Sequence, residues 1–237
     1  GQLGIGTNYD QKNAPVRIGF SGVVALAGGT AHSLALRTDG TVWAWGWNSS
    51  GQLGDGTTTQ RTTPVQVQGL SDVVAIATLG SSSFAVRSDG TAWGWGLNSN
   101  GQIGDGSTIT RLVPVQIPGL AGIVAITTGW SHTLALGSDG TVWAWGYNVF
   151  GQLGDGTTTN RLTRVQVQGL AEIVGIAAGS YHSLAIDADG VAWAWGYNGV
   201  GQLGDGTKTN RTVPVQVEGL ACTAVAAVAA GVNHSLA

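Results

Sequence analysis

The sequence predicts an all-β protein built from repeated four-stranded antiparallel units. Three observations indicate this: a repeat of 50 residues, short segments rich in Val, Ile, Trp and small residues, and turn-forming clusters of Gly, Asp, Asn and Ser between them. The motif GQLG or a close variant begins the repeats at residues 1, 51, 101, 151 and 201. A period of this length is typical of solenoids and propellers, and four short strands per repeat favour a β-propeller.

Each repeat contains four predicted strands, which we call A, B, C and D. In the second repeat they cover residues 73–77, 83–87, 91–96 and 114–117. Strand A is small and apolar, which suits the crowded inner edge of a blade. An Asp-Gly turn joins strands B and C, because Gly accepts the positive φ angle that a tight hairpin needs.

Strand C carries two Trp residues on one face, since side chains two positions apart in a strand point the same way. Eight of the ten Trp recur in this manner, and we expect all eight in the core. They are Trp43, Trp45, Trp93, Trp95, Trp143, Trp145, Trp193 and Trp195.

The repeats resemble those of the regulator of chromosome condensation family. The shared unit reads GQLGDGT, PVQV, GL, VVAIAAG, HSLAL and DGTVWAWG, and it covers the whole chain. The resemblance implies a propeller, commonly of seven blades, in which strand D completes the blade begun by the preceding strands A, B and C. Family members include nucleotide exchange factors, ubiquitin-ligase modules and bacterial proteins, so the resemblance implies a binding scaffold and favours a bacterial source.

This family rule predicts four complete blades and a partial fifth. The complete blades cover residues 23–67, 73–117, 123–167 and 173–217. The fifth has strand A at 224–230, strand B at 234–237 and strand D at 15–18, but no strand C. We therefore expect residues 1–237 to form a single propeller domain or a propeller fragment. Unpaired strand edges would promote self-association of such a chain.

Charge and composition argue against several classes of function. The net charge is −3 and the ten Lys and Arg are scattered singly, so we expect no nucleic-acid binding. The longest apolar stretch, near residues 224–230, is far shorter than the roughly 20 residues that span a bilayer, so no membrane insertion is expected. Low Lys content and nearly identical repeats favour a secreted or cell-surface bacterial protein.

Two polar positions recur and could hold a metal ion or an anion. One begins strand B and is occupied by His32, His132, His182 and His234, with Ser82 in the second repeat. The other pairs an Asp with an Arg in the C–D loop, as Asp55 and Arg61, Asp105 and Arg111, Asp155 and Arg161, and Asp205 and Arg211. We interpret both as structural: each His bonds a neighbouring loop, and each pair braces its own loop. No metal or cofactor is expected.

Catalysis is not expected either. Eight of the thirteen acidic residues belong to the repeat, and the other five lie in different blades. Acid–base or nucleophilic catalysis requires unlike groups within hydrogen-bond reach, and the sequence contains no such non-repeated constellation. The spacing of GQLGDG also differs from the dinucleotide-binding fingerprint. We therefore predict a non-enzymatic protein-interaction scaffold with an unidentified protein partner.

The predicted binding face carries the A–B and C–D loops, because strands A and C end on the same side of a blade. These loops differ between repeats, whereas the B–C turns barely vary. Aromatic residues are concentrated in them, and Trp and Tyr are typical of interface cores. The candidate partner-binding residues are Trp47, Trp130, Tyr147, Phe150, Tyr181 and Tyr197. Neutral sequence drift in loops without a binding role would produce the same variation between repeats.

Three other functions are open from the sequence. A carbohydrate-binding propeller would stack exposed aromatic rings on sugars. A structural spacer in a larger bacterial surface or secreted protein would need only the repeats. Guanine-nucleotide exchange, which the family resemblance allows, is disfavoured because the chain has no long protruding insertion and no basic tail.

Overall fold

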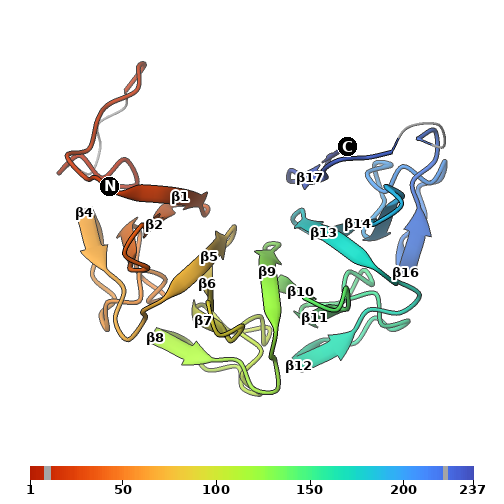
Figure 1. Ribbon diagram of the computed structural model, residues 1–237, viewed down its shortest axis with the longest axis horizontal. Coiled ribbons are helices and arrows are strands. Elements are labelled where there is room, and N and C mark those ends of the chain that lie inside the picture. Colours follow the sequence, from red (N-terminus) through yellow and green to blue (C-terminus); the bar gives the residue numbers. More distant parts are fainter. Residues whose placement is uncertain (8–11, 221–223) are drawn as a thin grey trace.

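The computed structural model describes residues 1–7, 12–220 and 224–237, and these residues form strands and turns without a helix. Four four-stranded antiparallel sheets and one two-stranded sheet follow one another along the chain. They stand side by side in an open arc, with both chain ends at the opening (Figure 1). No helix capable of crossing a membrane is found in the described part of the chain. The predicted propeller architecture is confirmed.

Each complete blade is a sheet whose strands pair in chain order. The first blade contains β1 (Val23–Gly28), β2 (His32–Arg37), β3 (Val42–Gly46) and β4 (Arg61–Gln66). The second contains β5 (Val73–Thr78), β6 (Ser82–Arg87), β7 (Ala92–Gly96) and β8 (Arg111–Gln116). The third contains β9 (Ile123–Thr128), β10 (His132–Gly137), β11 (Val142–Gly146) and β12 (Arg161–Gln166). The fourth contains β13 (Ile173–Ala178), β14 (His182–Asp187), β15 (Ala192–Gly196) and β16 (Arg211–Gln216). The first strand of each blade lies on the inner side of the arc and the fourth lies at its rim (Figure 1).

The fifth blade is smaller than the sequence predicts. It consists of β17 (Ala229–Ala230) and β18 (Ser235–Leu236), and residues 15–18, the predicted strand D, form no strand. A strand is stabilised by backbone bonds to a neighbour, and the C-terminal strands lie across the opening from residues 15–18 (Figure 1). The N-terminal segment covers the first blade instead, where the Phe20 ring packs on Trp43 with their centroids 5.2 Å apart.

The hydrophobic core lies mainly between neighbouring blades. Between the first and second blades, Leu53 and Val67 pack with Trp95 of the next strand C. Equivalent clusters contain Trp145 and Trp195. Trp95 Nε1 also donates to the carbonyl of Gln52, in the loop of the preceding blade, at 2.9 Å. Each of these indoles therefore fastens its own blade to the preceding one through both packing and a hydrogen bond.

The expectation that eight Trp are core residues holds fully for four of them. The second Trp of each strand C, namely Trp45, Trp95, Trp145 and Trp195, is 0–4% exposed. The first Trp of each strand C is only partly buried. In the first three blades its ring lies beside an Arg side chain, and the Arg164 guanidinium stands 4.5 Å from the Trp143 ring centroid. Removal of the second Trp should therefore destabilise the protein more.

Candidate functional site

The recurring His residues join neighbouring blades. His32 Nε2 lies 2.9 Å from the Ser83 hydroxyl of the next blade. Because Ser83 donates its own proton to the Gln52 carbonyl at 2.8 Å, it accepts from His32, and the proton sits on Nε2. The same contact joins His132 to Ser183 at 3.0 Å and His182 to Ser235 at 3.1 Å. The prediction that these His have a structural hydrogen bond to a neighbouring element is confirmed for these three, but the partner is a Ser on strand B of the next blade and not a loop residue.

These three imidazoles are held neutral. Their Nδ1 atoms are buried and have no hydrogen-bond partner. Burial lowers the pKa of His32 and of His182 to about 4, and that of His132 to about 3. Within the described residues, no group of three or more His, Cys, Asp and Glu is placed to hold a metal ion. These three His therefore act as structural hydrogen-bond donors between blades.

An Asn–Asp–Arg network braces each C–D loop. In the third blade, Asp155 accepts from Arg161 Nε at 2.8 Å and from the Thr157 hydroxyl at 2.7 Å. Asn148, fully buried, donates to Asp155 at 3.1 Å and accepts from the Leu153 amide at 2.9 Å. Burial opposes ionisation of Asp155, but the bonds from Thr157 and Arg161 outweigh it and keep its pKa below the ordinary value.

The predicted bracing role of the Asp–Arg pairs is confirmed in all four complete blades. The buried Asn was missed by the sequence reasoning. It occupies one position in each complete repeat, as Asn48, Asn98, Asn148 and Asn198. This recurrence could have predicted a structural role, because a polar residue that is repeated shortly after every Trp-rich strand is expected to have the same partner in every blade.

Asp155→Asn is expected to lower the free energy of unfolding by about 1–3 kcal/mol, the usual contribution of hydrogen bonds to a charged group. The measurement is chemical denaturation at neutral pH. Asp39→Asn is the matched control, because Asp39 also accepts from a Thr two residues later, at 2.6 Å, but on the surface. Water screens that site, so the control should destabilise the protein less. Equal losses would contradict the bracing role.

The A–B loops and the residues after strand C share one face, as predicted. The amide of Tyr147 donates to the Ser131 carbonyl at 2.8 Å, and that of Tyr197 donates to the Tyr181 carbonyl at 2.9 Å. The first and second blades repeat this bond at Trp47 and Leu97. Aromatic residues at these positions are therefore brought to the same side of the arc.

Five of the six candidate aromatic residues form one continuous aromatic cluster, which comprises Trp130, Tyr147, Phe150, Tyr181 and Tyr197. Tyr181 lies at its centre, with its ring centroid 5.9 Å from Trp130, 6.1 Å from Tyr147 and 5.5 Å from Phe150. Phe150 also contacts Tyr197 at 5.0 Å and Tyr147 at 6.2 Å. The third and fourth blades thus contribute to one apolar surface.

Trp47 stands apart from the aromatic cluster. It lies in the first blade, is 50% exposed, and its Nε1 donates to the Ser49 hydroxyl at 2.7 Å. The described residues show no ring contact between it and the other five candidates. The sequence therefore placed Trp47 on the same face as the other candidates but could not show that it is isolated there.

The cluster is partly exposed to solvent. Trp130 is 48% exposed and the other four rings are partly exposed, while Val149 beside Phe150 is 49% exposed. The fold does not require aromatic side chains at the positions of Trp130 and Phe150. The equivalents of Trp130 in the first, second and fourth blades are Thr30, Gly80 and Ser180, and those of Phe150 are Ser50, Asn100 and Val200.

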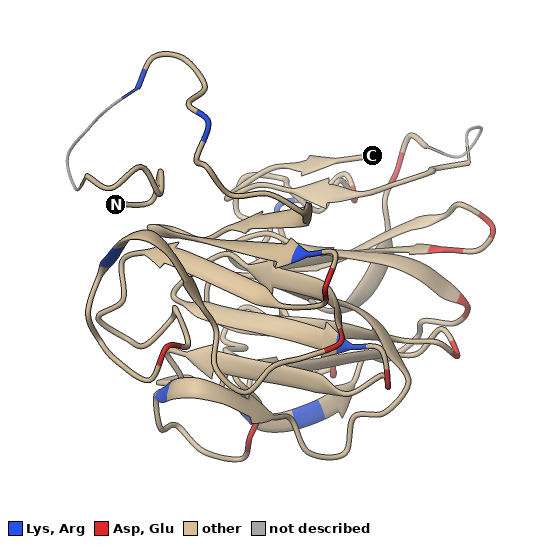
Figure 2. Ribbon diagram, turned by 60° about the vertical axis from the view of Figure 1, so that its left-hand side comes forward, with Lys and Arg blue, Asp and Glu red and all other residues tan. Residues whose placement is uncertain are grey.

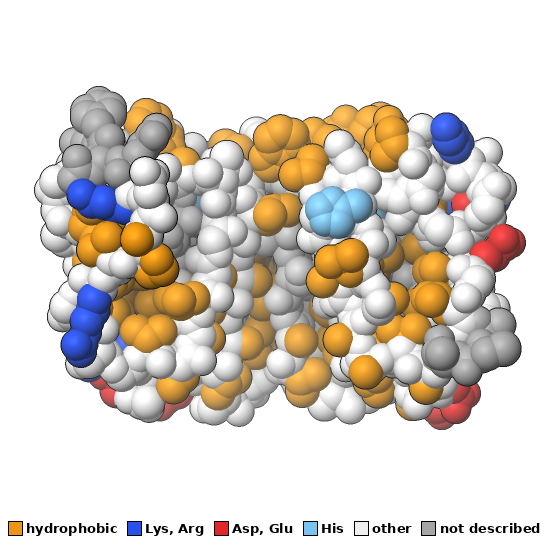
Figure 3. Space-filling model, turned by 90° about the horizontal axis from the view of Figure 1, so that it is seen from above, with side chains coloured by type: hydrophobic (Ala, Val, Ile, Leu, Met, Phe, Trp, Pro, Cys, Tyr) orange, Lys and Arg blue, Asp and Glu red, His pale blue; other side chains and the backbone are white. Residues whose placement is uncertain are grey.

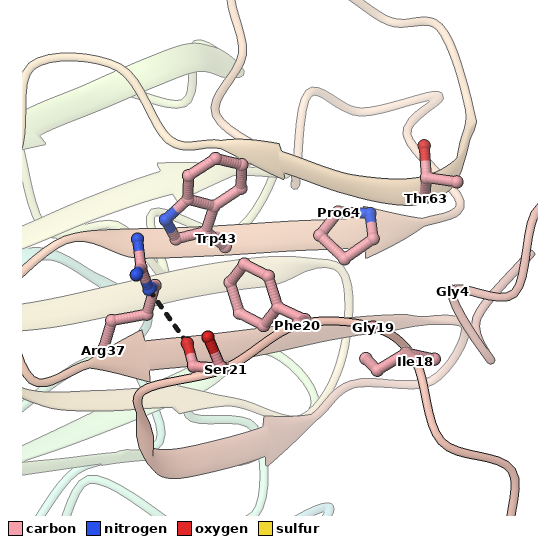
Figure 4. Close-up of a pocket in the computed structure, with 9 residues that line it drawn as sticks. All are labelled: Gly4, Ile18, Gly19, Phe20, Ser21, Arg37, Trp43, Thr63 and Pro64. Carbon is pink, nitrogen blue, oxygen red and sulfur yellow. Dashed lines mark hydrogen bonds between the residues drawn. The ribbon is translucent and has the colours of Figure 1, made fainter.

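A separate cavity of about 440 Å³ lies at the N-terminal end of the arc. Phe20, Trp43 and Arg37 line it, and Arg37 donates to the Ser21 carbonyl at 3.1 Å (Figure 4). Arg37 is the one ionisable side chain among its lining residues, so the cavity offers no acid–base pair. None of the candidate aromatic residues lines it. Charged side chains elsewhere are scattered along the ribbon (Figure 2).

Comparison with known proteins identifies related propellers. Human WBSCR16 is 29% identical, with a TM-score of 0.82 over 91% of this chain and 57% of that one. Prp20p from Saccharomyces cerevisiae, whose structure was described with its binding properties to Gsp1p and histones, is 26% identical, with a TM-score of 0.77 over 90% of this chain and 55% of that one. Yeast RCC1 (Prp20) bound to Kap60 gives 25% identity and a TM-score of 0.76, over 90% and 53% of the two chains.

This chain therefore spans little more than half the length of the solved structures that it resembles. No curated protein matches it. The family model of the RCC1-like domain matches residues 1–237, and its propeller fold is that of a protein-interaction module. The matched length, the repeated blades and the structural likeness together show that this protein belongs to the RCC1-like domain family.

Proposed function

We propose that this protein is a non-enzymatic interaction scaffold that binds a protein partner through the aromatic cluster. The observation that carries the proposal is the continuous contact of five loop side chains from two blades, with ring centroids 5.0–6.2 Å apart. Such rings provide a large apolar contact area at a small cost in side-chain entropy. Their confinement to the third and fourth blades distinguishes this surface from the repeated scaffold.

Its structural relatives support a protein partner. Prp20p has binding properties to Gsp1p and histones, and yeast RCC1 is bound to Kap60. These partners are those of the relatives. The shared propeller fold supports protein binding by this chain, but it does not support any of these named partners. A spacer without a partner would have no use for aromatic rings at positions where other blades hold Thr, Gly, Ser or Asn.

Carbohydrate binding is the second candidate function, because exposed aromatic rings can stack on sugars. The planes of neighbouring rings in the cluster are inclined by 54–72°. The rings therefore do not form one flat surface on which a sugar ring could stack. This geometry favours irregular protein side chains over an extended sugar chain.

The test is the double variant Trp130→Ala, Tyr181→Ala. A photo-crosslinking residue at the exposed Val149 position first identifies the partner, whose affinity for the parent protein is then measured. The double variant is expected to weaken binding at least about thirtyfold, because it removes the centre of the cluster and its most exposed ring. The free energy of unfolding should change by about 1 kcal/mol or less, since loop rings of this kind contribute little to the core.

Trp47→Ala is the matched control, because it removes an exposed aromatic side chain from the same face outside the cluster. It should leave binding unchanged. Unaltered affinity of the double variant, or an equal loss in the control, would contradict the proposal. Binding on a glycan array that the double variant abolishes would establish the carbohydrate alternative instead.

A further inference from the structure

The aromatic cluster offers its partner no charged group. Its five side chains are neutral at neutral pH, and the Arg residues that end the neighbouring C–D loops are already engaged. Arg161 and Arg211 each form an ion pair with the Asp of the same loop, at 2.7 Å. Lys208 is the only other basic residue in the C–D loops of the third and fourth blades. The part of a partner that covers the cluster is therefore expected to be uncharged as well.

Acidic side chains lie instead at the opposite ends of the strands. Each B–C turn of the complete blades contains an Asp, namely Asp39, Asp89, Asp139 and Asp189. Seen from the open side of the arc, acidic side chains lie toward the lower edge and the right-hand end, while apolar side chains project along the upper edge (Figure 3). The B–C turns face away from the A–B loops, so these carboxylates do not select what binds to the aromatic cluster.

The polar atoms that the cluster does present are unused hydrogen-bond donors. Within the described residues, the hydroxyls of Tyr147, Tyr181 and Tyr197 and the Nε1 of Trp130 make no hydrogen bond. Trp47 differs, because its Nε1 already donates to a neighbouring Ser hydroxyl at 2.7 Å. An indole N–H can only donate. Electrostatic complementarity therefore requires acceptors, which carry partial negative charge, on a partner without formal charge.

Three common modes of peptide recognition do not suit this surface. Strand addition needs an open edge, but the C strands next to the cluster, β11 and β15, are paired on both sides. A docked helix has its carbonyls engaged in its own hydrogen bonds, so it offers few acceptors to the Tyr and Trp donors. Phosphorylated and acidic motifs need a cluster of available Arg residues, and the two nearby Arg are ion-paired.

A proline-rich segment in the polyproline II conformation fits these requirements. Its carbonyls have no partner within the segment, and Pro brings no N–H that would need an acceptor. Two residues of such a helix advance about 6 Å, at about 3.1 Å per residue. The successive ring contacts from Trp130 through Tyr181 and Phe150 to Tyr197 measure 5.9, 5.5 and 5.0 Å. Every second residue of the segment can therefore meet the next ring.

We propose that the aromatic cluster binds a proline-rich, polyproline II segment of its protein partner. Pyrrolidine rings of the segment pack on the aromatic rings, and the Trp130 indole and the Tyr181 hydroxyl donate to its backbone carbonyls. Because such a segment is stiff before it binds, little conformational entropy is lost in the complex. This proposal rests on the function proposed above, since it specifies the chemistry of the partner at the same site.

The test uses fluorescein-labelled decaproline as the probe and fluorescence anisotropy against the full chain as the readout. Saturable binding is expected in a titration up to about 1 mM protein. Decaproline made of D-proline is the matched control, because it has the same composition and apolar surface but forms a helix of the opposite hand. The control should bind at least about tenfold more weakly. Absence of binding, or equal binding of the two peptides, would overturn the proposal.

Variants of the chain place the decaproline on the cluster. Trp130→Ala removes a ring and a donor together and should weaken binding at least about tenfold. Tyr181→Phe keeps the ring and removes only the hydroxyl, so it should weaken binding about threefold, the usual effect of one lost hydrogen bond. Trp47→Ala should bind decaproline as the parent does. Unchanged binding in either cluster variant, or an equal loss in Trp47→Ala, would overturn the proposal.

The partner identified by crosslinking at Val149 separates this proposal from the proposed function. A partner that loses affinity for the double variant Trp130→Ala, Tyr181→Ala, but is not displaced by decaproline, would overturn the polyproline II proposal and leave the proposed function standing. A partner that binds the double variant as tightly as the parent would overturn both. Displacement of the partner by decaproline, with D-decaproline inactive, is the expected result.

Discussion

Trp145→Ala is expected to lower the free energy of unfolding by about 3–5 kcal/mol, the range typical of large-to-small substitutions of buried aromatic residues. The ring is fully buried and packs with Phe84 and Ile117 of the preceding blade. Its loss would open a cavity between two rigid sheets and leave the Gln102 carbonyl without the indole donor that now lies 2.8 Å away. Both effects act on the blade interface.

Chemical denaturation at neutral pH measures this loss. Trp143→Ala is the matched control, because it removes the same side chain from the same strand face at a position that is only partly buried. Its effect should be clearly smaller. If the two substitutions destabilised the protein equally, the distinction between the buried and the marginal Trp would be wrong.

Acidification from pH 7.5 to 4.5 is expected to remove most of the stability of this protein. His32, His132 and His182 are neutral in the folded state, with the pKa lowered by burial to about 4, 3 and 4. In the unfolded chain each binds a proton near pH 6.5, so the unfolded state takes up more protons between pH 6.5 and 4, and stability falls with pH across that window. The loss levels off below the folded-state pKa values.

The expected loss is about 2–3 kcal/mol for each His at pH 4.5, or about 8 kcal/mol for the three. That is comparable to the whole stability of a typical domain, about 5–15 kcal/mol. The braced carboxylates do not contribute in this window. The pKa of Asp155 is lowered, with burial opposing the shift and bonds from Thr157 and Arg161 outweighing it, so its stabilisation is lost only below the ordinary Asp value near 3.8.

His132→Ser tests the cause, because the second blade already carries Ser82 at this position, where its hydroxyl donates to the Leu97 carbonyl at 2.7 Å. Urea titrations at pH 7.5, 6.0 and 4.5 compare the two proteins. The variant should be less stable than the parent at pH 7.5, since it lacks the bond to Ser183, but it should lose about 2–3 kcal/mol less on acidification. An identical pH dependence in parent and variant would show that His132 is not responsible.

The local elements followed from short-range chemistry. Asp-Gly at 39–40 produced its hairpin because Gly40 takes a φ of 73° while Asp39 accepts from the Thr41 amide. Short segments rich in Val, Ile, Trp and small residues marked the strands, and the resemblance to the family repeat gave the number of complete blades. The Asp–Arg pairs were interpreted correctly for the same reason, since their partners lie six residues apart in one loop.

The errors have a different origin. Residues 15–18 have the composition of strand D, but a strand requires a partner, and no strand in the described part of the chain pairs with them. Trp143 and Trp145 share one strand face, yet only Trp145 is fully buried. Asn148 alone does not predict a buried hydrogen-bonding role. It has that role because the C–D loop folds over it. Each outcome depends on a neighbour that the local pattern does not specify.

By itself, the sequence determined the blades, their turns and the face on which the variable loops lie, because these depend on strand-forming segments, turn residues and strand direction within one repeat. Only the tertiary structure decided that Tyr181 joins Trp130 and Phe150 into one aromatic cluster while Trp47 stands alone. The physical reason is that these features arise between blades. Their distances are set by how successive sheets pack around the arc, which no single repeat encodes.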